Sequence, residues 1–166
     1  MAVTGKIDRK YMAHYIDAGS LCGGLTPKYE RLGKDLEEYN VELNPDTETS
    51  KNILGESTFK HNGYEVSSDA DPFYADTTSD LFGALQKIVD GRLKDDNLKT
   101  KAVEVHLWTE ATAGKYEAYQ QDCYVVPTSY GGDTSGYQIP FTVNYVGERV
   151  KGKFDINSGT FTADSK

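Results

Sequence analysis

The stretch SYGGDTSGYQIPFTVNYVGERVKGKF, residues 129–154, decides the fold class that this sequence predicts. Apolar side chains occupy alternate positions in its middle: Ile139, Phe141, Val143 and Tyr145. This alternation predicts a strand with one buried and one exposed face. The apolar parity changes after Gly147-Glu148, where we expect a turn, and a second strand should fold back on the first. Asn157-Ser158-Gly159 should then turn the chain again towards Phe161, which makes a meander.

Further strands are expected along the rest of the chain. The segments are 11–17, 38–44, 57–62, 101–108 and 116–127. In the last of these the apolar parity slips near Gln120-Gln121, as a β-bulge would make it do.

One stretch, residues 77–93, has helical periodicity, with apolar residues at Leu81, Leu85 and Ile88. Thr78 or Ser79 is placed to cap its first amides. With seven or eight strands and one helix, the expected fold is mainly β with one α-helix. We expect an antiparallel β-sandwich or small barrel with the helix packed across it.

Length and composition favour one domain spanning residues 1–166. The net charge of −8 should repel nucleic acid rather than bind it. Cys22 and Cys123 fit no metal spacing, and two reduced thiols are expected rather than a disulfide. No signal peptide or membrane-spanning run is recognised, and we expect a cytosolic protein without membrane contact.

The candidate chemical groups form no convincing active site. Three histidines fall on three different expected strands, and none has a second ligand at i+2 or i+4: His14, His61 and His106. Asp69, Asp71 and Asp76 offer oxygen ligands for calcium, but the spacing of a known calcium loop is absent, which favours a solvated turn. The glycine-rich segment 131–136 lacks the lysine and helix of a phosphate-binding loop and is expected to be a wide hairpin loop. We therefore expect no enzyme activity, no cofactor and no metal.

The expected strand 38–44 and the segment after it form the least ordinary part of the sequence. Polar side chains alternate along one face of this strand: Glu38, Asn40, Glu42 and Asn44. Residues 45–56 then read as a long hairpin loop with an apolar tip, Ile53-Leu54. An apolar tip on a long loop is commonly buried against another surface.

Four segments, which span most of the chain in order, resemble the tail tube (major tail) proteins of tailed phages and of prophages of Gram-positive bacteria. They are YERLGKDLEEYNVELNP at 29–45, NILGESTFKHNGYE at 52–65, DPFYADTTSDLFGALQKIVDGRL at 71–93 and TSYGGDTSGYQIPFTVNYVGERVKGKF at 128–154. The resemblance implies a structural virion protein, assembled in the host bacterial cytoplasm. Its hexameric rings stack into a tube through which DNA is ejected. The implied partners are copies of the chain, a tape measure protein, a tail terminator and, in a contractile tail, a sheath.

Within such a tube, the polar face of residues 38–44 is the candidate lumen wall. Glu38 and Glu42, with neutral Asn40 and Asn44, would repel the DNA phosphates weakly and let the duplex slide. Asn52, Ile53 and Leu54 are the candidate contact with a neighbouring ring or subunit.

Two alternatives stay open. The chain could form the tube of a phage-derived contractile particle, such as a bacteriocin or a secretion-type system, or be a carbohydrate-binding β-sandwich that uses its tyrosines.

Overall fold

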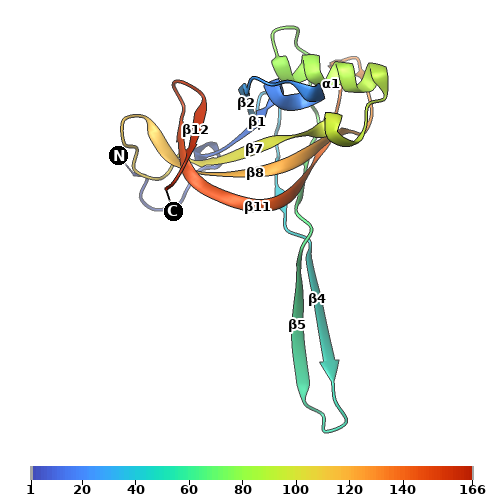
Figure 1. The fold of residues 1–166 in the computed structure, drawn as a ribbon, viewed down its shortest axis with the longest axis vertical. Coiled ribbons are helices and arrows are strands. Elements are labelled where there is room, and N and C mark those ends of the chain that lie inside the picture. Colours follow the sequence, from blue (N-terminus) through green and yellow to red (C-terminus); the bar gives the residue numbers. More distant parts are fainter. Residues whose placement is uncertain (1, 166) are drawn as a thin grey trace.

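The computed structural model of the protein describes residues 2–165 and contains one main antiparallel sheet of eight strands. The order across the sheet is β2-β1-β7-β8-β11-β6-β3, and β12 pairs with β11 outside this path. The sheet curls into a half-barrel (Figure 1). The strands are β1 (Met12–Asp17), β2 (Tyr29–Leu32), β3 (Val41–Glu42), β6 (Ser67–Ala70), β7 (Lys99–His106), β8 (Lys115–Pro127), β11 (Phe141–Asp155) and β12 (Thr160–Ala163).

Strand β11 is long and bent, and it corrects one expectation. Its pairing with β8 is interrupted between Val146 and Val150, on either side of Gly147. The prediction of a turn at Gly147-Glu148 is wrong, because the chain continues in the same direction. A bulge at this position accounts for the change in which alternate residues are apolar. The expected irregularity at Gln120-Gln121 lies opposite this bulge, but the extra residues are in β11. Bulges bend strands, and β11 curves across the body of the molecule (Figure 1).

Helix α1, Asp80–Gly91, is the α-helix predicted for residues 77–93. The Ser79 hydroxyl caps it by accepting a hydrogen bond from the N–H of Phe82 at 3.1 Å. Its buried side chains join the larger core cluster: Leu81, Ala84, Leu85, Ile88 and Val89. The helix packs against a short 3₁₀ segment, η2 (Ala18–Gly23), and against β8. Two further 3₁₀ segments are η1 (Arg9–Tyr11) and η3 (Asp95–Leu98).

The segment 33–40 connects β2 and β3, the two ends of the curled strand path. Tyr39, in this segment, is 7% exposed. Its ring lies 4.7 Å from the ring of His14 on β1, and its hydroxyl is 3.2 Å from the hydroxyl of Tyr145 on β11. The Arg9 guanidinium donates to the Tyr39 carbonyl at 2.8 Å. Tyr39 therefore ties the two sides of the half-barrel together.

A two-stranded arm, residues 45–64, extends away from the body (Figure 1). It consists of β4 (Pro45–Lys51) and β5 (Ser57–Tyr64), paired antiparallel with a bulge between Asp46 and Thr47. The sequence predicted a strand at 38–44 and a loop at 45–56. In the structure β3 has two residues, and most of the expected loop is strand β4. The return strand was expected at 57–62 and lies in β5.

The last turn of the expected meander is present: residues 157–159 lead into β12, which pairs with β11. The expected wide hairpin loop, 131–136, lies in a small hairpin of β9 (Gly131–Asp133) and β10 (Gly136–Gln138). The fold class, mainly β with a single α-helix in the described chain, is confirmed. Within residues 2–165 no helix is both long and apolar enough to span a membrane.

Candidate assembly surfaces

The tip of the arm, residues 52–56, is held in one conformation by Asn52. The Asn52 side-chain oxygen accepts hydrogen bonds from the N–H groups of Leu54 at 2.9 Å and Glu56 at 3.0 Å. Its side-chain nitrogen donates to the Glu56 carboxylate at 2.7 Å. Gly55, with φ of +79°, adopts the left-handed conformation that glycine tolerates and donates its N–H to the Asn52 carbonyl. The tip is therefore a preorganised turn.

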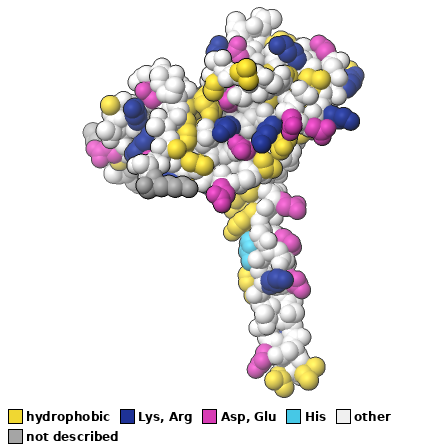
Figure 2. Space-filling view, viewed as in Figure 1, with side chains coloured by type: hydrophobic (Ala, Val, Ile, Leu, Met, Phe, Trp, Pro, Cys, Tyr) yellow, Lys and Arg dark blue, Asp and Glu magenta, His cyan; other side chains and the backbone are white. Residues whose placement is uncertain are grey.

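This turn presents two apolar side chains to solvent. Ile53 is 103% exposed and Leu54 is 77% exposed, and Figure 2 shows hydrophobic side chains at the far end of the arm. Burying such a side chain contributes about 1.5–3 kcal/mol. A fixed tip whose apolar side chains are exposed in the described part of the chain is suited to binding another surface, because little conformational entropy is lost on contact.

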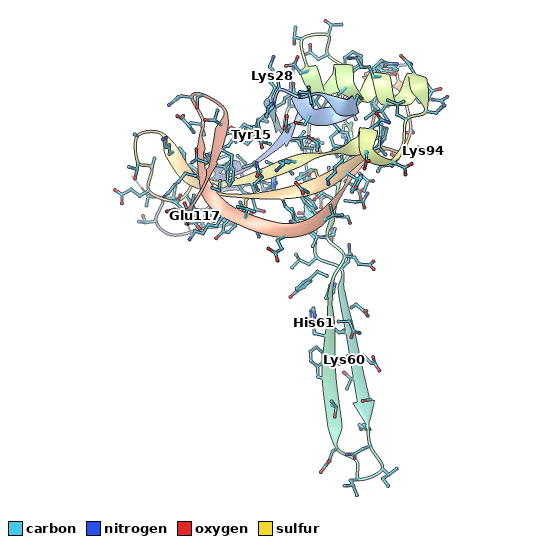
Figure 3. All side chains as sticks on the ribbon, in the orientation of Figure 1. Tyr15, Lys28, Lys60, His61, Lys94 and Glu117 are labelled. Carbon is cyan, nitrogen blue, oxygen red and sulfur yellow. The ribbon has the colours of Figure 1, made fainter. Side chains whose placement is uncertain are left out.

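The arm itself has two unlike faces. Residues directly opposite in a ladder share a face, and the pairs Thr49 with Phe59 and Thr47 with His61 make one of them. The other face carries the pair of Glu48 with Lys60; Lys60 and His61 are labelled in Figure 3.

The first face exposes more aromatic surface, and we call it the aromatic face. Phe59 is 65% exposed, and the ring of Tyr64 lies 4.7 Å from that of His61 near the base of the arm. An isolated two-stranded hairpin is marginal in water, so a partner on this aromatic face would stabilise the arm.

The predicted lumen residues lie on the body near the base of the arm, and all four are exposed. Glu38, Asn40 and Glu42 line one shallow pocket of about 240 Å³ together with Asp69 and Asp71. The structure thus brings three of the predicted residues together and adds two carboxylates from β6 and the residue that follows it.

The fourth predicted lumen residue, Asn44, points elsewhere, since its amide donates to the Glu65 carbonyl at 2.9 Å and lies 3.2 Å from the Ser67 hydroxyl. The orientation of all four towards a bore stays a prediction.

The aspartates considered as calcium ligands have different partners in the structure. Asp69 accepts from the Thr142 hydroxyl at 2.8 Å, whereas Asp76 pairs with Lys34 at 3.1 Å and accepts from Thr78. Across residues 2–165, no group of three or more His, Cys, Asp or Glu side chains is arranged to hold a metal ion. Cys22 and Cys123 are both free.

Two of the three histidines lie on neighbouring strands, His14 on β1 and His106 on β7, and Glu104 is paired directly opposite His14. Glu104 contacts His106 at 2.7 Å and Arg149 at 2.9 Å beside a groove of about 560 Å³ that His14 also lines. Burial, with the charge of Arg9 added, lowers the pKa of His14 to about 4. Burial alone would raise the pKa of Glu104, but the hydrogen bond with His106 and the charge of Arg149 hold it below its usual value. Glu104 thus joins His106 and Arg149 through its carboxylate, and the Arg149 side chain is 47% exposed. His61 lies apart on the arm.

Two features of these surfaces were not predicted from the sequence. The aromatic face of the arm was missed because residues 45–56 were taken as loop, although Phe59 and His61 alternate at strand spacing. A cluster of cations beside β2 was missed because its members come from two places, residues 9–10 and 31–34, which only the pairing of β1 with β2 brings together.

The chain matches no protein-family model and no curated protein. Among solved structures it is similar to the sheath/tube terminator of an extracellular contractile injection system, PVC, seen in its extended state by cryo-electron microscopy. That likeness has 10% sequence identity and a TM-score of 0.49, and it covers 90% of this chain and 99% of the other. At this level it defines neither a family nor a function.

Proposed function

We propose that the protein is a non-enzymatic structural subunit that assembles with copies of itself into rings stacked as a tube. The observation that carries this proposal is the arm: a preorganised tip with two exposed apolar side chains, and a face that carries the exposed ring of Phe59, none of them buried by residues 2–165. Monomeric proteins rarely present such surfaces, whereas assembling subunits do.

The strand order adds support for a contact that repeats. The path ends at β2 on one side and at the short β3 on the other, and the arm leaves the body next to β3. When one surface of a subunit binds a different surface of the next copy, the contact is head-to-tail. Repeated head-to-tail contacts close into a ring or continue as a filament.

The resemblance of four sequence segments to phage tail tube proteins gives the proposal its specific form. In that form the subunits make hexameric rings, the rings stack into a conduit for DNA ejection, and tape measure and terminator proteins bind its ends. A tube of a bacteriocin-like contractile particle would use the same subunit surfaces.

The test is the state of the purified chain at rising concentration. Light scattering after gel filtration should show association, and negative-stain microscopy should show rings or tubes about 100 Å across, the width of six domains of this size around a pore. A chain that stays monomeric at every concentration contradicts the proposal. Retention of that monomer on a glycan column would favour the carbohydrate-binding alternative instead.

The lumen assignment has its own test. A map of the assembled tube should place Glu38 and Glu42 on the inner wall, where two carboxylates per subunit would repel the DNA phosphates. A map that places both residues on the outer surface would remove this part of the proposal.

A further inference from the structure

The cluster of cations beside β2 surrounds a pocket of about 500 Å³. We call this pocket the basic cup. Its lining comes from η1, β1, β2 and the segment that follows β2. We call its three exposed cations, Arg9, Lys10 and Arg31, the rim, and its less exposed apolar side chains, Met12, Leu32 and Leu36, the floor. The cup therefore combines positive charge with apolar surface.

Its rim cations have no acidic partner in the described chain. The Arg9 guanidinium donates to the carbonyls of Met12 at 2.7 Å and Tyr39 at 2.8 Å, and Arg31 donates to the carbonyl of Lys10 at 3.1 Å. None of Arg9, Lys10 and Arg31 forms an ion pair within residues 2–165. In a chain of net charge −8, three unpaired cations in one place form a local excess of positive charge.

Three other charged groups line the same cup, and only the two carboxylates among them reduce this excess of positive charge. Lys34 is paired with Asp76 at 3.1 Å. Glu37 and Glu38 also lie on the lining, and the Glu38 carboxylate accepts a hydrogen bond from Asn40.

The tip of the arm has the complementary chemistry. Ile53 and Leu54 are apolar and exposed, and Glu56 places a carboxylate two residues further on, fixed by Asn52. Leu25 is another exposed apolar residue, at 95%. The nearest charged residue in its sequence is Lys28, and no Asp or Glu lies within three residues of it. The tip differs from Leu25 in offering two exposed apolar side chains together with an acidic group that a hydrogen bond fixes.

The tip cannot reach the basic cup of its own chain. Strand β4 has seven residues, which at 3.3 Å per residue carries the tip about 23 Å away from the body. The ladder between β4 and β5 keeps the arm extended, and the arm points away from the sheet (Figure 3). Any cup that receives this tip belongs to another molecule.

We propose that the basic cup of one copy receives the arm tip of a second copy. Ile53 and Leu54 cover the apolar floor, and Glu56 pairs with the cations of the rim. This inference rests on the proposed function, because it names the surface that receives the arm within the same assembly. The contact joins two different surfaces, so it repeats from one copy to the next.

Charge reversal on both sides tests the pairing. Lys10→Glu is the preferred cup variant because the Lys10 side chain makes no hydrogen bond in the described chain. Lys10→Glu and Glu56→Lys should each weaken association, measured by sedimentation equilibrium, about tenfold. The combined variant should recover most of the loss, since it restores opposite charges. Controls are Glu48→Gln on the polar face of the arm, which removes a charge without placing two lysines opposite each other, and Lys153→Glu on β11. Both should leave association unchanged.

Disulfide trapping gives an independent measurement. In a Cys22→Ser background, an Ile53→Cys chain mixed with a Leu36→Cys chain should form a covalent dimer under mild oxidation. A Leu25→Cys chain in place of Ile53→Cys should not. No dimer from the first mixture, or no recovery in the combined charge variant, overturns the inference.

These outcomes separate the inference from the proposed function. If the unmodified chain never associates, the proposed function fails, and the inference fails with it. If the chain associates and needs its arm tip, but tolerates Lys10→Glu and gives no Ile53-to-Leu36 disulfide, only the inference is overturned. Lys10-dependent binding of duplex DNA, with association unaffected by Lys10→Glu, also overturns it.

Discussion

Replacing Ile53 and Leu54 by aspartate separates the role of the arm tip in assembly from any role in folding. Both side chains are exposed in the single chain, at 103% and 77%. Exposed substitutions usually change the free energy of unfolding by no more than about 0.5 kcal/mol. For a domain of this size, that corresponds to a change in melting temperature of about 1–2 °C.

The expected effect of the same double variant on association is much larger. Full burial of one isoleucine or leucine contributes about 1.5–3 kcal/mol, and two such side chains contribute about 3–6 kcal/mol. Every 1.4 kcal/mol is a tenfold change in affinity, so the association constant should fall by about 100-fold or more. Two new carboxylates near Glu56 would add repulsion between neighbouring acids.

The assay combines differential scanning fluorimetry for folding with light scattering and negative-stain microscopy for assembly. Leu25→Asp is a matched control, since Leu25 is 95% exposed and lies outside the arm; it should keep both melting temperature and assembly. Normal rings or tubes from the Ile53→Asp, Leu54→Asp variant would refute the reasoning. A fall of more than about 5 °C in its melting temperature would show that the tip contributes to folding.

Three further predictions concern the body and the arm separately. Tyr39→Ala should destabilise the half-barrel by about 3–5 kcal/mol, as for other buried aromatic truncations, whereas Tyr39→Phe loses only the hydroxyl contact and should cost about 1 kcal/mol in chemical denaturation. Asn52→Ala should speed hydrogen exchange at the Leu54 and Glu56 amides, whose acceptor it removes, and leave protection in β7 and β8 unchanged. The pKa of His14 is lowered from 6.5 to about 4 in the folded chain; the unfolded chain therefore binds the proton more tightly, and stability should fall as the pH drops from 6.5 towards 4. The pH dependence of the melting temperature should be shallower in His14→Gln, and equal slopes for the two proteins would contradict this assignment.

Local patterns in the sequence predict the elements whose periodicity reflects burial. Helix α1 lies within the expected 77–93, because its apolar side chains recur at helical spacing and Ser79 caps its first turn. Strands β7 and β8 lie close to the expected segments for the analogous reason, since alternate residues on them are buried.

The arm was predicted less well, because none of the residues in β4 and β5 is buried in the described part of the chain. Without a buried face, residues 45–51 show no apolar alternation, and the polar segment read as a loop. The apolar tip at Ile53-Leu54 was nevertheless visible, because an exposed pair of large apolar residues before Gly55 is a local feature. The same limit explains β11, where a parity change is compatible with either a turn or a bulge until the partner strand is known.

The sequence by itself determined a mainly β chain with one capped helix, an acidic net charge and an apolar tip between residues 45 and 56. Only the tertiary structure decided that Tyr39 closes the half-barrel, that Asp69 and Asp71 join Glu38 and Glu42, and that the basic cup exists. Periodicity and capping act between residues within a few positions of each other. The cup, in contrast, depends on the register between β1 and β2 and on the path of residues 33–40, which are set by packing between segments distant in the chain.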